Sequence, residues 1–401
     1  FIFSLFAITT ARGGKDLKVG LFGVEQVLEK KSPYDNPTDP DRPLFRYAPG
    51  FTILQYPFLL QSKMISPFKF KDITPSVQAW YWAEILALLA SAMILLKLIP
   101  APSRETGIRN LKAAFLLALP FIGYELANCQ NKLIALFFIL LAIYLFEKDR
   151  HFLSAVSFAV AITIYIPLIF FIVYFILRRK WWYIVHFAAG CALIFLVVPY
   201  LVFGFEFNNY LLKDWFLRTL KPFFLTTSYA SYIDLRVSSQ SLPSAVGRLL
   251  GFGKTWQFHY LIHPVLMHII IRIFSGLIFL FSCLAVWNQR KEISRGLGYA
   301  VFIILPLVLP QYCLYYTWSW LFVVYFAIFN YISWPEVPGD KKRFLLITAV
   351  ILLLSSYSMA IRVLRWFSVL FLGTIWCWGV LVATLISEKK HKGLSEGVRV
   401  K

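Results

Sequence analysis

Long apolar runs and two long polar segments alternate along this chain of 401 residues. A helix needs about 20 apolar residues to cross a bilayer. Runs near this length, or somewhat shorter, lie at 79–100, 112–127, 132–147, 152–164, 166–178, 183–204, 265–288, 297–313, 317–334, 343–361 and 366–387. Residues 1–10 are too few to cross, and we expect them to be the truncated end of a first helix. The pattern predicts an all-α polytopic membrane protein with a bundle of about twelve transmembrane helices.

Basic residues cluster in the short connections that this topology places on one side. The clusters are Arg104, Arg109 and Lys112; Lys148 and Arg150; Arg178, Arg179 and Lys180; Arg290, Lys291 and Arg295; Lys341, Lys342 and Arg343; and Lys389, Lys390 and Lys392. The positive-inside rule then places both termini in the cytoplasm. This topology requires 152–178 to be a helical hairpin that turns near Ile166 and Pro167. Each arm is short for a full span. The two arms therefore either cross the membrane, re-enter it from the same side, or lie within the bundle and shielded from lipid.

Two long segments, 11–78 and 205–264, then face outward. Both are rich in Pro, Asp, Asn and aromatic residues, and both are too long to be simple connectors. Residues 19–30 have the periodicity of an amphipathic helix, and residues 208–220 could lie in the membrane interface. We expect one integral membrane domain over 1–401, with helices 2–7 in 79–204, helices 8–12 and a cytoplasmic tail in 265–401, and the active face on the two outer segments.

Composition and charge narrow the class of protein. Hydrophobic residues make up 59% of the chain and charged residues 15%, which excludes a soluble globule of this size. The net charge of +20 raises nucleic acid as a partner, but the basic residues beside the spans account for it better. The five cysteines show no paired spacing. His259 and His263 stand four apart, and we interpret them as interfacial histidines rather than metal ligands.

Asp16 is the leading candidate for chemistry. It directly follows the first apolar stretch and opens the first outer segment. A carboxylate at the mouth of a helix bundle is where a membrane enzyme would place a general base. Position alone leaves a solvated residue after the first helix as an equally good interpretation.

Several short motifs resemble glycosyltransferase family 87, membrane enzymes of the GT-C type that use a polyprenyl-phosphate-linked sugar, usually mannose. The motifs are Asp16-Leu17, Ser32-Pro33-Tyr34-Asp35, Phe45-Arg46-Tyr47-Ala48-Pro49, Tyr56-Pro57-Phe58, Gln130-Asn131, and Ser239-Gln240-Ser241-Leu242 followed by Arg248. Each motif is short. The resemblance rests on their occurrence in the same order and at similar spacing over nearly the whole chain. The chain departs from the family pattern at Ser239, which replaces an Asn, at Tyr165-Ile166-Pro167, which lacks a Lys, and at Tyr315-Tyr316, where histidines are expected.

The resemblance implies a GT-C type bundle that transfers a sugar to a lipid or glycan acceptor on the outer face of the cytoplasmic membrane. Asp16 would be the general base, the reaction would invert the anomeric carbon, and no cofactor would be required, although a divalent cation stays open. The expected partners are the polyprenyl-phosphate sugar, the acceptor and membrane lipids, with no nucleic acid.

The candidate substrate-binding residues are Asp35, Arg46, Tyr47, Gln130, Asn131, Gln240, Arg248, Tyr316 and Trp318. Arg46 and Arg248 match the oxygens of a donor phosphate, but either could instead make a structural ion pair with Asp35 or Asp234. Asp35 can equally be explained as a turn residue. The aromatic side chains can belong to the aromatic belt at the membrane interface or to the core, and Gln240 can serve only to pack its loop. Lys132 is a further cation, for which snorkelling to the interface is the simpler account.

Two other classes of function remain open. A lipid-linked glycan flippase or transporter predicts internal repeats and ionisable groups near the bilayer midplane. The acidic residues concentrate instead in the outer segments, and only Glu84, Glu125 and Arg272 lie within or at the edge of spans. A noncatalytic membrane scaffold is the third alternative.

Overall fold

The computed structural model describes residues 15–34, 45–62, 75–178, 181–221, 238–254, 257–260, 263–289, 291–311 and 313–396. The regular secondary structure of these residues is helical apart from one short antiparallel hairpin, in which β1 (Gly251–Lys254) pairs with β2 (Gln257–Tyr260). The prediction of an all-α fold is therefore confirmed in its main feature. Residues 1–10, predicted as the end of a helix, lie outside the described residues.

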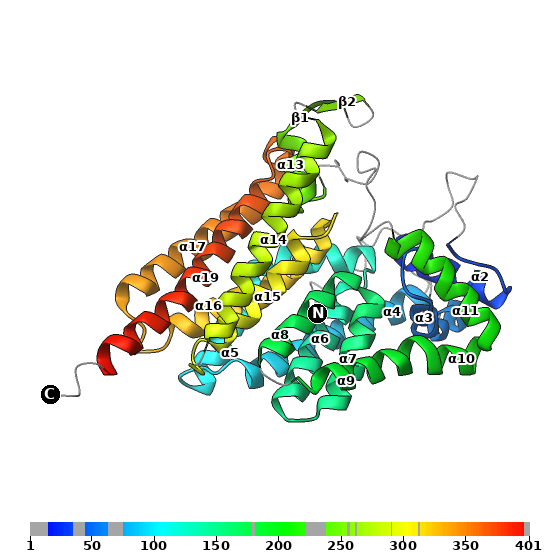
Figure 1. Ribbon diagram of the computed structural model, residues 1–401, viewed down its shortest axis with the longest axis horizontal. Helices are drawn as coiled ribbons and strands as arrows, with labels where there is room; N and C mark the ends of the chain where they lie inside the picture. The colour runs from blue at the N-terminus through cyan, green and yellow to red at the C-terminus, as the bar shows by residue number, and fades with distance from the viewer. Residues whose placement is uncertain are drawn as a thin grey trace. The chain divides into compact units, whose positions relative to one another are not determined.

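The chain divides into two compact units, and we describe each by itself (Figure 1). The first comprises Phe1–Ile94, Phe121–Ile169 and Trp181–Thr227, and the second comprises Leu95–Pro120, Phe170–Lys180 and Ser228–Lys401. Two of the boundaries fall inside long helices, α4 (Pro75–Leu98) and α5 (Arg104–Asn128).

The first unit contains the two helices of the first polar segment and the helices around α6. They are α2 (Lys15–Leu28), α3 (Pro49–Ser62), α6 (Lys132–Glu147), α7 (His151–Ile164), α9 (Tyr183–Cys191), the π-helix η2 (Ala192–Val197), α10 (Val198–Phe203), α11 (Phe205–Trp215) and the π-helix η3 (Phe216–Leu220). Its core is the packing of α7 between α6 and α9. Gly190 permits a close crossing there, because a Cβ on it would lie 2.8 Å from the backbone of Ala155.

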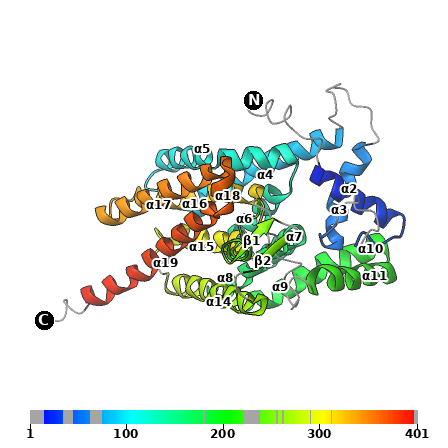
Figure 2. The same ribbon diagram turned by 90° about the horizontal axis from the view of Figure 1, so that it is seen from above.

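The second unit is built around α15 and α16. Its elements are α8 (Phe171–Leu177), α13 (Leu242–Leu249), α14 (Pro264–Asn288), α15 (Arg295–Val308), the 3-10 helix η5 (Tyr315–Trp320), α16 (Leu321–Ile332), α17 (Gly339–Tyr357), the 3-10 helix η6 (Ser358–Ala360), α18 (Arg362–Trp366) and α19 (Val369–Glu396). The side chains of α15 are buried from Gly296 to Val308, as expected for a helix that is apolar all round. Figure 2 shows α16, α17 and α19 running alongside one another.

Six helices in the described part of the chain are long and apolar enough to cross a membrane. They are Ser76–Leu98, Arg104–Asn128, Tyr183–Phe203, Val265–Trp287, Gly339–Ala360 and Val369–Glu388. Three shorter apolar helices, His151–Ile164, Ile166–Leu177 and Arg295–Val308, fall at predicted spans. The multi-pass prediction is confirmed, whereas the total of about twelve spans stays a prediction.

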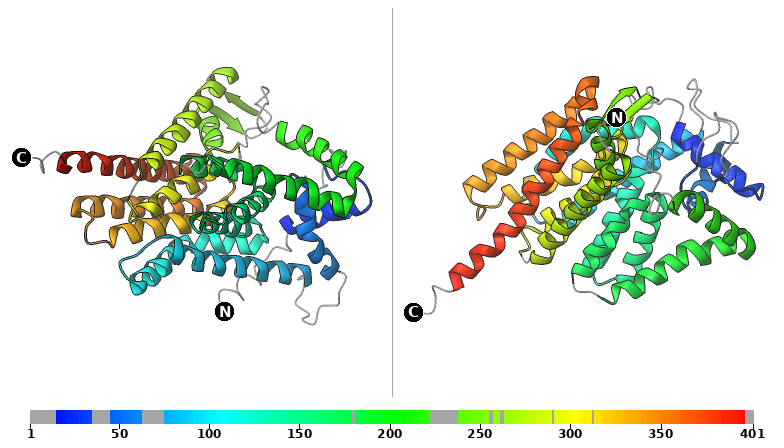
Figure 3. Two further views of the ribbon diagram at one scale, coloured as in Figure 1. Left: turned by 60° about the horizontal axis from the view of Figure 1, so that its bottom comes forward. Right: turned by 45° about the horizontal axis from the view of Figure 1, so that its top comes forward.

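Two interruptions between helices bear on the site. A break is present where the turn of the 152–178 hairpin was predicted: α7 ends at Ile164, Tyr165 is extended, and the 3-10 helix η1 (Ile166–Phe170) follows. The hairpin itself stays a prediction. Gly204 has a φ of +86° between α10 and α11, a conformation that suits glycine. This turn brings α11 back along α10 and onto α3, as the blue and green ribbons of Figure 3 show. The amphipathic helix predicted over 19–30 corresponds to α2, and residues 208–220, for which a place in the membrane interface stays a prediction, belong to α11 and η3.

Candidate functional site

Asp16 lies in the first turn of α2, a helix that begins four residues before the start predicted from the amphipathic pattern. This helix packs on α3 and buries one face, which includes Leu17, Val24 and Val27. The side chain of Asp16 lies outside the described part of the structure. Asp16 thus stands at the N-terminal end of a helix that is anchored on α3.

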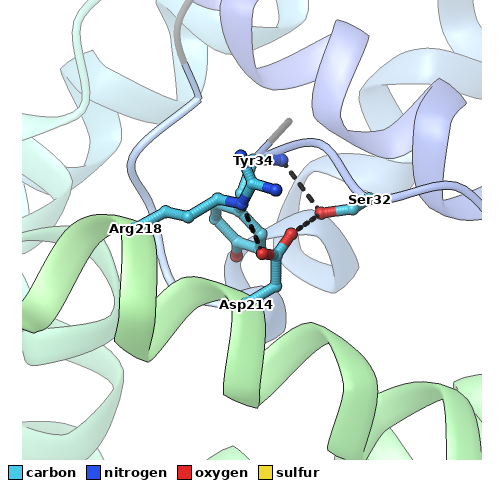
Figure 4. A network of polar contacts seen from close by, with 4 residues as sticks. All are labelled: Ser32, Tyr34, Asp214 and Arg218. Atoms are coloured by element: carbon cyan, nitrogen blue, oxygen red, sulfur yellow. Dashed lines mark hydrogen bonds and ion pairs between the residues drawn. The ribbon is translucent and has the colours of Figure 1, made fainter. Parts of the chain in front are cut away.

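The buried carboxylate of Asp214 forms hydrogen bonds that fix the segment after α2. Asp214 of α11 is 9% exposed, and it accepts hydrogen bonds from Ser32 Oγ and, at 2.5 Å, from Arg218 Nε (Figure 4). Ser32 Oγ in turn accepts a hydrogen bond of 3.2 Å from the backbone N–H of Tyr34. The network ties the first polar segment to α11 across 182 positions of sequence.

Tyr34 extends this network toward α3. Its phenol donates a 2.7 Å hydrogen bond to the carbonyl of Tyr47. Burial, and then the charge of Asp214, raise the pKa of Tyr34 well above its ordinary value, so the phenol keeps the proton that it donates. The rings of Tyr34, Phe45, Tyr47 and Phe51 contact one another in succession, with centroids 4.4 to 5.5 Å apart. Tyr47 is therefore held by its carbonyl and by both of its aromatic neighbours.

Arg46 is placed by its backbone. The indole N–H of Trp215 in α11 lies 3.4 Å from the carbonyl oxygen of Arg46, to which it donates. The side chain of Arg46 is exposed. This arrangement leaves the position of the residue fixed and its guanidinium at the surface.

Lys132, the first residue of α6, lies beside Tyr47. Its ammonium is 4.4 Å from the ring centroid of Tyr165 and 5.9 Å from that of Tyr47, and it donates a 2.9 Å hydrogen bond to Asn131 Oδ1. The residue is 7% exposed. Snorkelling was the simpler account from sequence, but it requires an ammonium at the surface, so the buried position contradicts it. Tyr47 and Asn131, both predicted site residues, are brought together here by a lysine.

The α5–α6 junction next to Lys132 is rigid. Cys129 has a φ of +50°, and the indole of Trp80 donates a 3.0 Å hydrogen bond to the carbonyl of Gln130. Glu125 accepts a 2.6 Å hydrogen bond from the backbone N–H of Leu133. Gln130 is buried, and its side-chain amide nitrogen has no hydrogen-bond partner among the described residues. A buried amide donor thus lies in the same turn as the Lys132 ammonium.

Glu84 is a second buried carboxyl group of the first unit. It lies on α4 and interacts electrostatically with Glu125, and both residues are 0% exposed. Neither carboxyl oxygen of Glu84 has a hydrogen-bond partner among the described residues. Intramembrane ionisable groups of this kind are costly and usually functional, which keeps the transporter alternative in view.

The remaining predicted residues belong to the second unit, where the turn before α13 is bound to the chain around η5. Ser239 pairs with Leu314 in an isolated antiparallel bridge, and the backbone N–H of Gln240 donates to the carbonyl of Cys313 at 2.9 Å. The Gln240 amide also donates to the carbonyl of Arg365 at 3.0 Å. These hydrogen bonds favour the interpretation that Gln240 packs its loop, which was one of the two alternatives left open by the sequence.

Arg248 is buried, at 2% exposed, in the last turn of α13. Its guanidinium donates to the carbonyl of Trp366 at 3.2 Å and to Ser368 Oγ at 2.6 Å. Neither partner is the ion pair considered from sequence, and Asp35 and Asp234 lie outside the described residues. The bonds favour a structural role, in which Arg248 connects α13 to the chain between α18 and α19.

Arg248→Leu is expected to lower the free energy of unfolding by about 1–3 kcal/mol, because it leaves two acceptors without their donor. Thermal unfolding in detergent would measure this loss. Arg248→Lys separates the two roles. A structural arginine predicts that turnover falls only as far as the folded fraction does, whereas a phosphate ligand predicts lost turnover in a fully folded protein.

Tyr316 and Trp318 both lie in η5. Tyr316 is half-buried, whereas Trp318 is 0% exposed, and its indole N–H has no hydrogen-bond partner among the described residues. Such burial is typical of a core side chain rather than of one that stacks on a sugar. No group of three or more His, Cys, Asp or Glu side chains within the described ranges could hold a metal ion.

Sequence reasoning missed Asp214 as an anchor and undervalued Lys132. Asp214 is one of several acidic residues of an outer segment, and only its four-residue spacing from Arg218 was a visible signal. For Lys132 the signal was its position next to Gln130-Asn131, at the start of an apolar run.

Comparison with known proteins adds the family. The model of glycosyltransferase family 87 matches residues 45–310, which include the Tyr47, Lys132 and Arg248 regions but not Asp16. Neither the search of curated proteins nor that of solved structures found a match. Since the match covers well over half of the chain, this multi-pass membrane protein belongs to glycosyltransferase family 87.

Proposed function

We propose that this glycosyltransferase transfers a sugar, mannose in the first instance, from a polyprenyl-phosphate donor to a lipid or glycan acceptor. The reaction takes place at the extracytoplasmic face of the cytoplasmic membrane, on the side of the two polar segments. The acceptor hydroxyl oxygen attacks the anomeric carbon, the bond from that carbon to the phosphate oxygen breaks, and the hydroxyl proton passes to Asp16. The polyprenyl phosphate leaves, and the anomeric carbon is inverted.

The buried ammonium of Lys132, between Tyr47 and Tyr165, is the observation that best supports this proposal. The leaving group is a phosphate that gains charge as the glycosidic bond breaks, and a fixed cation in a site of low dielectric stabilises such charge. The amide of Gln130 is a second buried donor in the same turn. Arg46, with its backbone fixed and its side chain exposed, can bind the same phosphate from the surface.

The aromatic residues suit the other part of the donor. Tyr47 is a half-buried member of the Tyr34–Phe45–Tyr47–Phe51 cluster, and its accessible part could contact the sugar ring. No nucleotide is needed, since the phosphate ester already activates the sugar. We propose no cofactor, and the effect of a divalent cation is part of the test.

Transfer of labelled sugar by the purified protein in liposomes tests the function. Polyprenyl-phosphate mannose and polyprenyl-phosphate glucose would be supplied in parallel, with and without EDTA. Incorporation from one donor would establish the reaction and name the sugar. No incorporation from either, together with movement of the lipid-linked sugar across the bilayer, would replace the enzyme by a transporter.

Lys132→Met is expected to raise the donor KM and lower kcat together, by about tenfold to a hundredfold overall, because it removes a cation beside the phosphate. Lys132→Arg should recover part of the activity. Lys148→Met is the matched control, since Lys148 follows the opposite end of the same helix. Equal activity of Lys132→Met and the control would contradict the phosphate role.

A further inference from the structure

The second unit contains a pocket of about 590 Å³ whose lining residues have no role in the site described above. It is formed by the connections from α4 to α5, from α14 to α15 and from α16 to α17, together with Glu388 of α19. Its charged lining comprises Lys291, Glu292, Glu336, Lys341 and Glu388. The positive-inside rule predicts the cytoplasmic side for these connections.

The pocket presents donors and acceptors in fixed places. Tyr331 Oη donates a 2.5 Å hydrogen bond to Glu388 Oε1, and Lys341 Nζ donates a 2.9 Å hydrogen bond to Ser387 Oγ. Ser387 and Glu388 are consecutive residues of α19, and both Glu388 and Lys341 line the pocket, so its wall carries a carboxylate and an ammonium. The ligand that suits this pair carries one positive and one negative group a few atoms apart.

Trp334 adds a hydrogen-bond donor that is unsatisfied within the described residues. Its side chain lines the pocket, and its indole nitrogen is buried without a hydrogen-bond partner among the described residues. Buried polar groups of this kind are normally satisfied by protein, water or ligand. A phosphate oxygen in the pocket would accept a hydrogen bond from this N–H, and the lining lysines Lys291 and Lys341 would neutralise its charge.

We infer that this pocket binds a phosphate ester that carries a primary ammonium, the chemistry of a phosphatidylethanolamine headgroup. The phosphate would bind Lys341, Lys291 and the Trp334 indole, and the ammonium would bind Glu388 and Glu336 through charge-assisted hydrogen bonds. The apolar side chains of Ile293 and Val337 would contact the glycerol end. This site is separate from the sugar-transfer reaction and does not depend on it.

The test compares lipids with identical acyl chains added to the delipidated protein in detergent. Phosphatidylethanolamine is expected to raise the unfolding temperature by about 5 °C more than phosphatidylcholine, whose methylated ammonium cannot donate hydrogen bonds. Soluble phosphoethanolamine is the second arm. Stabilisation by it as well would support the headgroup chemistry from a soluble source, and stabilisation by the lipid alone would assign the membrane as the source.

Variants locate the effect. Glu388→Gln should abolish the preference for phosphatidylethanolamine over phosphatidylcholine, and Lys341→Met should weaken the binding of both by about tenfold. Lys342→Met, a lysine next in sequence that does not line the pocket, should bind as wild type does. Equal stabilisation by phosphatidylcholine or phosphatidylglycerol, or equal loss in Lys342→Met, would overturn the inference.

Photocrosslinking uses the wild-type protein, so its result does not depend on whether the variants fold. A phosphatidylethanolamine with a diazirine near its headgroup should label wild-type protein within 331–341 or at the C-terminal end of α19. Labelling confined to other helices would also overturn the inference. Sugar transfer need not be measured in any arm, so failure here leaves the proposed function untouched.

Discussion

Asp16→Asn is expected to lower kcat for sugar transfer by about a hundredfold to ten-thousandfold, the usual contribution of a general base, with little change in the donor KM. Asparagine keeps the size and hydrogen-bonding capacity of the side chain but cannot accept the acceptor proton. It is also well tolerated at a helix N-terminus, so α2 should remain folded. Turnover of purified variant and wild type in liposomes, normalised to folded protein, measures the effect.

The same helix offers the control for this prediction. Glu25 is exposed on α2, and Glu25→Gln removes an equal charge without approaching the helix N-terminus. It should retain wild-type turnover. If Asp16 instead serves only to stabilise the positive end of the α2 dipole, Asp16→Asn would lower the unfolding temperature slightly and leave turnover per folded molecule intact. That result would exclude Asp16 as the base.

Asp214→Ala is expected to lower the free energy of unfolding by about 1–3 kcal/mol, because Ser32 Oγ loses its acceptor in a buried place. The Arg218 part of the network contributes less, since that side chain is 45% exposed and its charge is screened by water. Chemical or thermal unfolding in detergent measures the change. Glu206→Ala, an exposed acid on the same helix, is the control and should have almost no effect.

A double-mutant cycle with Ser32→Ala tests whether the two residues act through each other. A coupling of about 0.5–3 kcal/mol is expected, because each single change already breaks the shared hydrogen bond. The activity of Asp214→Ala should fall mainly through the donor KM, since the network holds Tyr47 beside Lys132 through Tyr34. Strictly additive unfolding energies would show that the two side chains stabilise the protein independently.

The apolar pattern predicted most helices well, because a lipid environment leaves the backbone few alternatives to a helix. The run 132–147 matches α6 at both ends, and the break at Tyr165 follows the expectation of a turn before Pro167. The pattern was less informative for 339–360 and 362–396, where polar residues extend the helices beyond their apolar parts. Such ends are set by hydrogen bonding and capping, not by hydropathy.

The sequence by itself determined the class of this protein, its helices and the family resemblance, because these depend on local hydrophobicity and on short motifs. Only the tertiary structure decided which polar side chains are buried together. Ser32 and Asp214 are far apart in the chain, and Tyr47 reaches Lys132 only once α3 is packed. Arg248 looked equally suited to phosphate and to structure until its two acceptors were known. Which side chains are buried, and which hydrogen-bond partners they have, depends on packing between segments that are distant in the chain. The type of one residue and its spacing from its neighbours do not determine either.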